Sequence, residues 1–328
     1  MKKRILITGG SGTIGTALTK RLLLDGNIVC VFDNDENGLF NLENKIDKRF
    51  KDKVRFFLGD IRDLDRLDIA CNKVESIFHC AALKHVMLNE YNPIEAVKTN
   101  VDGVSNVILA ALRNKVERVV FTSSDKAVNP TSTMGTTKLL GERLITSANN
   151  LVGDSPTRFS SVRFGNVFNS RGSVIEIFRN QIKNRLPVTI THEDMSRFFL
   201  TTDDAVDLCI LTERRMKGAE IFIKNMGSFK IKDLALAMYK DIKNVKFDYV
   251  GLKPGEKIYE ELITDQEAVR AYSKDDIIIV LPDTVESMPA NLIHSYNEIK
   301  SSYSFYNNAL RSDEHNMTIK EIGQFIGS

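Results

Sequence analysis

Residues 4–15 read RILITGGSGTIG, in which an apolar run is followed directly by closely spaced glycines. The run has the length and composition of a buried strand, and the segment TALTKRLLLDG has the pattern of a helix. A glycine-rich turn between a first strand and a first helix predicts a phosphate-binding loop, because free N–H groups at a helix start attract anions.

Three glycines in this turn have separate expected roles. Gly9 permits the tight turn, Gly12 lets a pyrophosphate approach the backbone, and Gly15 lets helix and strand pack closely. Thr13 and Ile14 open the helix, where N–H groups face the phosphates. The spacing Gly-x-x-Gly-x-x-Gly differs from Gly-x-Gly-x-x-Gly, and a tight turn without a ligand is the alternative. We predict a dinucleotide site.

The rhythm of strand and helix continues outward from this turn. Short apolar runs such as NIVCVFD, KVRFFLGD, SIFHCAA and ERVVFTSS alternate with segments of helix length. Such a pattern indicates an α/β fold with a doubly wound parallel sheet covered on both faces. The rhythm becomes irregular from about Asn169. We therefore expect a dinucleotide-binding domain at 1–168, its sheet completed by segments around 191–225, and mainly a smaller, interleaved substrate-binding lobe at 169–328.

The ends of the next predicted strands supply further candidate cofactor contacts. Asp33 ends the second strand, where a carboxylate accepts hydrogen bonds from an adenosine ribose and repels a 2′-phosphate, so NAD is favoured over NADP. Asp60 and Ile61 follow the third strand and are placed to meet the adenine. Ala81 and Ala82 follow the fourth strand and leave room for the cofactor. An Asp that only caps a strand, and small residues that only pack, are the alternatives.

Composition argues against several classes of function. The 45 basic and 43 acidic residues nearly cancel, so the total charge favours neither nucleic acid nor an anionic membrane as a partner. The four cysteines are scattered and lack the spacing of a zinc or redox site, so we expect reduced thiols and no metal. No apolar stretch approaches the roughly twenty residues that a spanning helix needs. The sequence predicts a soluble, cytoplasmic protein.

A second stretch, FTSSDKAVNPTSTMGTTK at 121–138, indicates proton-transfer chemistry. Asp125 and Lys126 end a predicted strand, and the substrate side of an open α/β sheet lies at that end. Lys138 follows Met134 by four residues, so both side chains lie on one face of a helix. A surface salt bridge is the alternative for the Asp-Lys pair.

Together these motifs resemble those of the extended short-chain dehydrogenase/reductase family. The motifs that carry the resemblance occur in that family's order: TGGSGTIG, GDIRD, HCAALKH and FTSSDKA. More narrowly, the chain resembles inverting UDP-N-acetylglucosamine 4,6-dehydratases through SSDKAVNPTSTMGTTK, RFGNVFNSRGSVIEIFRNQI, DMSRFFLTTDDAVDL and LKPGEKIYEELIT. The resemblance runs from Lys3 to about Thr264. It implies a Rossmann fold, an NAD that stays tightly bound and is recycled, with NADP possible, and a nucleoside-diphosphate sugar as substrate.

The resemblance also implies catalytic roles. Lys126 is the base at C5 of the sugar and Asp125 the acid at O6. The wider family has a Tyr where Met134 stands, and a thioether cannot accept a proton. Either the chain is a catalytically inactive binder, or Asp125, or a water held by Ser124, accepts the C4 hydroxyl proton while Lys138 supplies positive charge. We favour the second. A base at Lys126 and an acid at Asp125 need pKa shifts opposite to those of an ion pair.

Further contacts are implied for the substrate and cofactor. Asn166, Ser173 at a helix start, Arg197 and Glu256 together describe a site for the sugar nucleotide, although each alone has a structural alternative. The AALKH loop brings Lys84 to the cofactor and substrate and makes His85 a candidate substrate contact. Asn100 is a further implied cofactor contact.

Two other functions remain open at this stage. A nucleotide-sugar 4-epimerase would bind NAD but has no use for an acid and a base at C5 and C6, and a regulator that lost its Tyr would bind NAD without catalysis. These motifs do not distinguish a uridine nucleotide from a guanosine nucleotide. They also do not decide whether the configuration at C5 of the sugar is inverted. The helices after Pro93 and Met134 resemble a family dimer contact, so we expect a homodimer or a larger homo-oligomer.

Overall fold

A computed structural model describes residues 2–168, 170, 173–239, 245–283, 288–314 and 316–327. A ten-stranded sheet forms its body, in the order β16-β14-β15-β10-β6-β5-β4-β1-β2-β3. Seven of these strands are parallel neighbours. They are β1 (Arg4–Thr8), β2 (Ile28–Asp33), β3 (Val54–Leu58), β4 (Ser76–His79), β5 (Arg118–Ser124), β6 (Arg158–Phe164) and β10 (Ile221–Lys224). The predicted fold class, a doubly wound parallel sheet, is confirmed.

Three antiparallel strands extend the sheet beyond β10. They are β14 (Ala271–Lys274), β15 (Ile277–Val280) and β16 (Ser304–Tyr306). The second half of the chain thus contributes to the same sheet as the first. Asn169, where we place the start of the lobe, lies outside the described residues, and the division into two domains stays a prediction.

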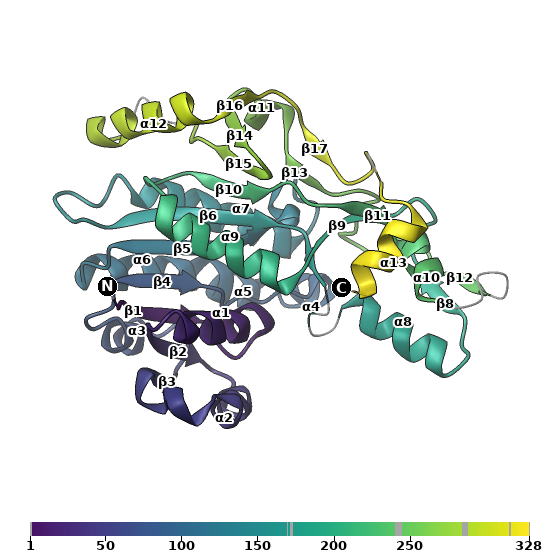
Figure 1. The fold of residues 1–328 in the computed structure, drawn as a ribbon, viewed down its shortest axis with the longest axis horizontal. Helices are drawn as coiled ribbons and strands as arrows, with labels where there is room; N and C mark the ends of the chain where they lie inside the picture. The colour runs from purple at the N-terminus through teal and green to yellow at the C-terminus, as the bar shows by residue number, and fades with distance from the viewer. Residues whose placement is uncertain are drawn as a thin grey trace.

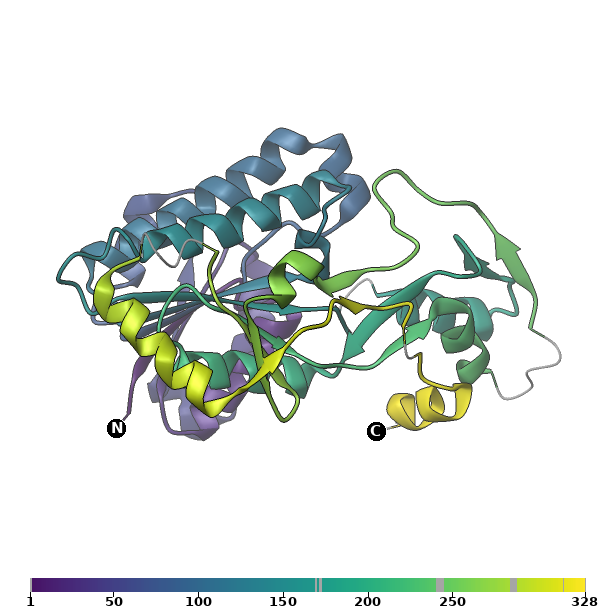
Figure 2. The same ribbon diagram turned by 90° about the horizontal axis from the view of Figure 1, so that it is seen from above.

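Helices cover both faces of the sheet and bury two apolar cores. One face carries α1 (Thr13–Leu24), α2 (Glu36–Lys45), α9 (Thr202–Arg215) and α12 (Ala290–Ser302). The other carries α3 (Leu64–Ala70), α6 (Gly103–Arg113) and α7 (Thr133–Ala148). Figure 2 shows the blue and teal helices of the second group on one side of the sheet. Because both faces are covered, strands such as β2 have near-continuous apolar runs, as in IVCVF, in place of an alternating pattern.

Shorter elements follow the strand ends on the α7 side. After β4 come α4 (Val86–Tyr91), α5 (Pro93–Val97) and a wider helical turn at Lys98–Asp102 that leads into α6. The 3-10 turn η1 (Lys48–Lys53) precedes β3, and the 3-10 turn η3 (Asp125–Ala127) follows β5. At the start of α7, the Ser132 side chain accepts a hydrogen bond from the Gly135 N–H and so fixes where the helix begins.

A smaller lobe lies beside the carboxyl ends of the parallel strands (Figure 1). Its three-stranded sheet has the order β11-β9-β7, and two strand pairs, β12-β8 and β13-β17, accompany it. Their bounds are β7 (Asn166–Val167), β8 (Val188–Ile190), β9 (Ser196–Leu200), β11 (Ser228–Lys230), β12 (Phe247–Tyr249), β13 (Glu261–Ile263) and β17 (Leu310–Arg311). The helices of the lobe are α8 (Val174–Lys183), α10 (Ile231–Met238) and α13 (Ile319–Gly327), and they surround a third apolar core. The short helix α11 (Asp265–Ala268) lies over the main sheet and contributes Ala268 to its core (Figure 1).

Candidate active site

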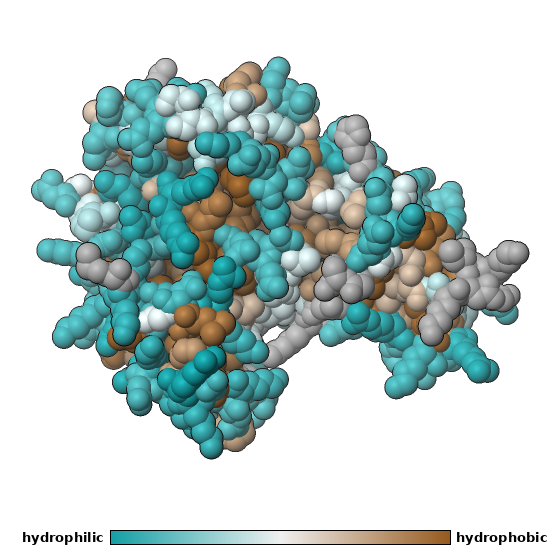
Figure 3. Space-filling model, in the orientation of Figure 1, coloured by the Kyte–Doolittle hydropathy of each residue, from teal (hydrophilic) through white to brown (hydrophobic). Residues whose placement is uncertain are grey.

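A cavity of about 860 Å³ opens where the parallel strands end and the lobe begins. Figure 3 shows the molecule hollowed between the sheet body and the lobe. The structure brings most of the predicted site residues to this cavity. Its lining includes Gly9, Gly12, Thr13, Ile14, Gly15, Asp33, Asp60, Ile61, Ala81, Ala82, Lys84, His85, Ser124, Asp125, Lys126, Met134, Lys138, Asn166 and Ser173.

The glycine turn has no room for side chains. Gly9 has a φ of +65°, and a Cβ on it would lie 2.6 Å from the Ala81 backbone nitrogen. A Cβ on Gly15 would lie 2.3 Å from the Gly9 carbonyl oxygen. The Gly12 N–H donates to that same carbonyl at 3.1 Å, which closes the turn before α1 begins. Gly9 and Gly15 therefore let strand, turn and helix pack closely, and Gly12 adds no side chain to the cavity wall, which suits a closely approaching pyrophosphate.

Carboxylates stand at the ends of β2 and β3. Asp33 accepts hydrogen bonds from the Ser11 N–H at 2.9 Å and the Ser11 hydroxyl at 2.7 Å, which ties β2 to the glycine turn. Asp60 is paired with Arg62 at 2.6 Å, and hydrogen bonding by that guanidinium lowers the pKa of Asp60. Arg62 also lines the cavity and bonds Glu95 at 2.8 Å. Arg62 belongs to the GDIRD motif at 59–63, but sequence analysis gave roles only to Asp60 and Ile61 of that motif.

Lys138 is a buried amine on α7. Its Nζ donates to the Thr122 carbonyl at 2.9 Å and lies 4.7 Å from the centre of the Phe121 ring. Burial disfavours the charged form, so the pKa of Lys138 falls to about 8. Met134, one turn earlier, is 3% exposed and also lines the cavity. The two side chains therefore share one wall, as their spacing predicted, but only Lys138 can exchange a proton there.

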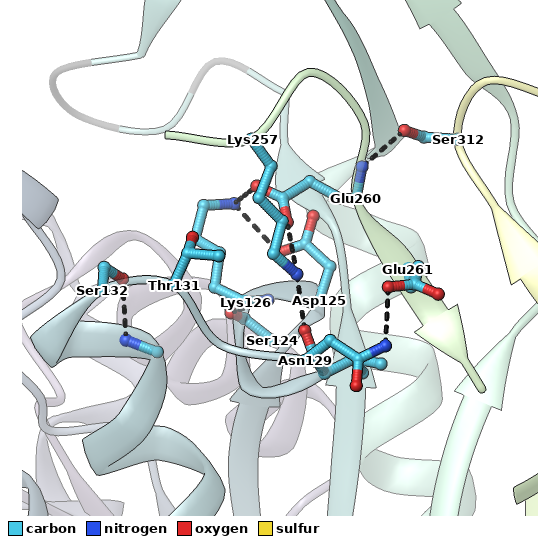
Figure 4. Close-up of polar contacts among 12 residues, drawn as sticks. Ser124, Asp125, Lys126, Asn129, Thr131, Ser132, Lys257, Glu260, Glu261 and Ser312 are labelled. Carbon is cyan, nitrogen blue, oxygen red and sulfur yellow. Dashed lines mark hydrogen bonds and ion pairs between the residues drawn. The ribbon is translucent and has the colours of Figure 1, made fainter. Parts of the chain in front are cut away.

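Asp125 and Lys126 lie at the carboxyl end of β5, in the turn η3 (Figure 4). The Ser124 hydroxyl accepts a hydrogen bond from the Lys126 N–H at 3.0 Å, which shapes this turn. The Lys126 Nζ donates to Asp125 Oδ1 at 2.9 Å and to Asn166 Oδ1 at 3.3 Å. Asp125 is fully buried, and its Oδ2 has no hydrogen-bond partner among the described residues. This residue of the cavity lining thus keeps one buried carboxylate oxygen without a donor among the described residues.

Glu260 stands behind Lys126 and was missed by sequence reasoning. Its Oε1 lies 3.7 Å from the Lys126 Nζ, but Glu260 does not belong to the cavity lining. Burial opposes the charge on Lys126, yet the carboxylates of Asp125 and Glu260 outweigh it and raise the pKa of Lys126. The tension expected from sequence is therefore present: the amine proposed as a base is held in its charged form.

Three predicted site residues lie outside the lining. Asn100 is buried, and its side chain bonds the Leu83 backbone and the Thr137 hydroxyl, so it fixes the AALK loop against α7. Arg197 donates to the carbonyls of residues 196, 257 and 258. Glu256 accepts from the Lys253 N–H in an exposed turn. Their predicted roles as direct ligand contacts find no support in these positions.

The remaining predicted contacts surround the entrance and the lobe side of the cavity. Lys84 and His85 are exposed, and His85 begins α4. Ser173 begins α8, and its buried hydroxyl has no hydrogen-bond partner among the described residues. A helix start with an unpaired hydroxyl is suited to an anionic group.

Two searches of the described residues bear on other classes of function. No helix among them is both long and apolar enough to cross a membrane. Nor do the described residues contain a group of three or more His, Cys, Asp or Glu side chains that could hold a metal ion.

Comparisons with known proteins complete the description of the site. The family model described as polysaccharide biosynthesis protein matches residues 5–282. The chain is 45% identical over 300 residues to an uncharacterised membrane protein of Methanocaldococcus jannaschii. The matched residues cover 89% of this chain and 89% of the relative. It is 38% identical over 286 residues to an inverting UDP-N-acetylglucosamine 4,6-dehydratase of Campylobacter jejuni, covering 86% of this chain and 83% of the relative.

Other relatives have different names. A UDP-glucose 4-epimerase of Rickettsia rickettsii is 37% identical over 276 residues, covering 82% of this chain and 80% of the relative. Among solved structures, the X-ray structure of Pen from Bacillus thuringiensis matches with 40% identity and a TM-score of 0.90, over 99% of this chain and 98% of that chain.

Proposed function

This chain belongs to the family of polysaccharide biosynthesis proteins, and we propose that it is an NAD-dependent nucleotide-sugar 4,6-dehydratase. The proposed substrate is UDP-N-acetylglucosamine, and the product is a UDP-4-keto-6-deoxy sugar with inversion at C5. The similarity to the Campylobacter jejuni dehydratase supports the substrate. The observation that carries the proposal is the ion pair of buried Asp125 with half-buried Lys126 at the cavity wall, with one Asp125 oxygen unpaired among the described residues.

The glycine turn fits a dinucleotide cofactor. Any Cβ at Gly9 or Gly15 would strike backbone, and Gly12 adds no side chain to the cavity wall that phosphates can approach. We place the pyrophosphate at the first turn of α1, the adenosine ribose at Asp33 and the adenine near Ile61. Asp33 supports NAD over NADP, because a carboxylate repels a 2′-phosphate. When bound, NAD would supply a hydride acceptor for C4 and a hydride donor for C6.

Asp125 can carry one proton through the reaction. As a carboxylate it accepts the proton of the C4 hydroxyl while that carbon is oxidised, and as the acid it then gives this proton to the departing O6. The proton lost at C4 therefore leaves with the water, and the step needs no Tyr. Because the Ser124 hydroxyl and the Lys126 N–H hold the turn η3, the carboxylate stays fixed at the strand end.

Lys126 can carry the second proton. The ketone at C4 makes the C5 proton acidic, and a neutral amine at Lys126 can remove it and later return a proton to C5. Lys138 lies on the neighbouring wall, where its positive charge stabilises the negative charge that develops on oxygen. The net reaction is redox-neutral, so the same cofactor molecule can serve repeated turnovers.

A 4-epimerase is the second candidate, because the Rickettsia rickettsii relative has that name. An epimerase oxidises and reduces C4 alone and leaves C5 and C6 untouched. Proton NMR of UDP-N-acetylglucosamine incubated with the protein and NAD separates the two. A dehydratase produces a C6 methyl signal and consumes the C6 hydroxymethyl signals, whereas an epimerase changes only the configuration at C4.

We also propose a homodimer formed through α5, α6 and α7. These helices contact one another, and apolar side chains on them stay exposed, including Ile94 at 68% and Leu109 at 44%. An exposed apolar surface of this kind is typical of protein interfaces. Light scattering of the protein and of Ile94→Asp tests the proposal: the variant should be a monomer, and an unchanged mass would place any interface elsewhere.

A further inference from the structure

Lys126 is held between two buried carboxylates that are far apart in the sequence. Its Nζ lies 2.9 Å from Asp125 Oδ1 and 3.7 Å from Glu260 Oε1. Figure 4 shows the Glu260 side chain directed toward the amine from the segment that precedes β13. Lys126 lines the cavity and Glu260 does not, so Glu260 can influence a bound substrate only through Lys126.

The other cations near Glu260 have acceptors of their own. Arg197 Nε and Lys257 Nζ lie 3.7 and 3.9 Å from its carboxylate. The Arg197 guanidinium donates to backbone carbonyls, and Lys257 donates to the Val128 carbonyl at 2.7 Å. Glu260 Oε2 has no hydrogen-bond partner among the described residues. A buried carboxylate with too few donors is costly, so a proton on Glu260 Oε1, the oxygen that faces Lys126, would relieve part of this cost.

The proposed reaction requires such a place. An ammonium group has no lone pair, so Lys126 must lose a proton before it can act on C5. Asp125 cannot store that proton, because it must stay ionised to receive the proton of the C4 hydroxyl. Among the described residues, Glu260 is the other carboxylate within 4 Å of the Lys126 Nζ.

We propose that Glu260 is a positioning residue that holds Lys126 at the cavity wall and takes its surplus proton. The Lys126 Nζ first has to close its 3.7 Å gap to Glu260 Oε1 to hydrogen-bond distance. An N–H bond of Lys126 then breaks, an O–H bond forms on Glu260, and the transfer reverses when the cycle ends. The total charge of the pair does not change, so no proton has to reach solvent. This inference rests on the proposed dehydratase function, and it goes further by naming the group that makes Lys126 a base.

The electrostatics of the cluster are consistent with this transfer. Burial raises the pKa of Glu260, and the charge on Asp125 adds to the effect, although Lys126, Arg197 and Lys257 oppose it. An exposed carboxylate would bind a proton more weakly than the buried Glu260 does. The raised pKa of Glu260 therefore favours transfer of a proton from Lys126.

The pH dependence of product formation tests the transfer. In the native protein the rate should be nearly constant between pH 6 and 7.5, because the proton moves within the pair. In Glu260→Gln the proton must leave for solvent, so the rate should be lower and should rise about tenfold for each pH unit. A Glu260→Gln profile as flat as the native one would overturn the proposal.

Two further variants control for structure. Glu261→Gln removes the neighbouring carboxylate, which bonds Asn129 at 2.9 Å, and should keep the native profile. Glu260→Asp keeps a proton acceptor and should keep a flat profile at a lower rate. If Glu260→Gln does not fold, the test rests on Glu260→Asp. A rate of product formation that rises with pH in Glu260→Asp would contradict the transfer.

A measurement without substrate separates this inference from the proposed function. The ¹³Cε shift of Lys126 in lysine-labelled protein, assigned by its loss in Lys126→Arg, reports the charge of the amine. Removing the Glu260 charge should lower the pKa of Lys126, because one of the two carboxylates that raise it is lost. An unchanged pKa overturns the inference even if the dehydratase reaction is observed. A lowered pKa without a C6 methyl product supports the Lys126–Glu260 coupling and rejects the reaction.

Discussion

The two ends of the cavity are built in different ways. At the nucleotide end, the turn at 9–15 is made of consecutive residues, and Gly12 adds no side chain to the cavity wall. At the chemical end, Lys126 meets Asn166 and Glu260, which come from strands and loops far along the chain. The first end depends on the space that glycines leave, and the second depends on charges that folding brings together. Substitutions at the two ends should therefore fail in different ways.

The largest effect is expected at the chemical end, from Asp125→Asn. The amide keeps the shape but can neither accept the C4 hydroxyl proton nor protonate O6, so the rate of product formation should fall roughly 10³-fold. NAD binding should remain native, since the glycine turn is untouched. Asp207→Asn, on the exposed face of α9, is the matched control. Loss of NAD binding in Asp125→Asn would mean that the two ends are not independent.

Gly9→Ala should break the nucleotide end instead. The new Cβ would strike the Ala81 backbone, and the φ of +65° adds strain, so NAD affinity should fall at least tenfold and unfolding should become easier by about 1–3 kcal/mol. Gly26→Ala is the control, because Gly26 has a φ of +87° but no atom within 4 Å of the added Cβ. Calorimetry with NAD and thermal unfolding measure both effects. Equal losses of NAD affinity in Gly9→Ala and Gly26→Ala would contradict the account, in which the loss comes from the close contact of Gly9 with the Ala81 backbone.

The charge of Lys138 gives a smaller, pH-dependent effect. Lys138 is charged below its pKa of about 8 and neutral above it. If its charge supports oxidation at C4, the rate should fall progressively as the pH rises through 8. Lys138→Arg keeps the charge and should remove this alkaline fall, although its rate will be lower. A native rate that instead rises through pH 8 would show that Lys138 acts as a neutral base.

Met134→Tyr should have the smallest effect. In our account Asp125 carries the C4 hydroxyl proton, so a phenol beside Lys138 adds a second acceptor and should change turnover less than tenfold. Steady-state kinetics with UDP-N-acetylglucosamine measure the change. An increase by orders of magnitude would mean that the native chain lacks its proper base.

The sequence was sufficient to predict which residues line one end of the cavity, because that end is built from neighbouring residues, while their binding of a nucleotide stays a prediction. The glycine turn, Asp33 and the order of strand and helix can be read from neighbouring residues, and the fold class follows from them. Helix periodicity likewise placed Met134 and Lys138 on one wall. The chemical end was predicted only in part, because Asp125 and Lys126 are adjacent in the chain whereas Glu260 reaches them through the tertiary fold.

The ligand roles predicted for Arg197, Glu256 and Asn100 stay predictions, because the structure gives these side chains protein partners outside the cavity lining. Arg197 and Glu256 have the composition of ligand contacts, but an arginine fork can equally be saturated by backbone carbonyls, and a glutamate can close its own turn. Asn100 fixes a loop through side-chain bonds that no spacing reveals. Which partner a polar side chain chooses depends on the groups that folding leaves unpaired nearby.

The central claim is that Asp125 and Lys126 move separate protons during one turnover. Incubation of the protein with NAD and UDP-N-acetylglucosamine in deuterated water, followed by proton NMR, tests it most directly. The account predicts a new methyl group at C6 that contains only protium, next to a C5 that carries deuterium, and no such product from Lys126→Met. A product with deuterium in the methyl group, or a sugar altered only at C4, would contradict the account.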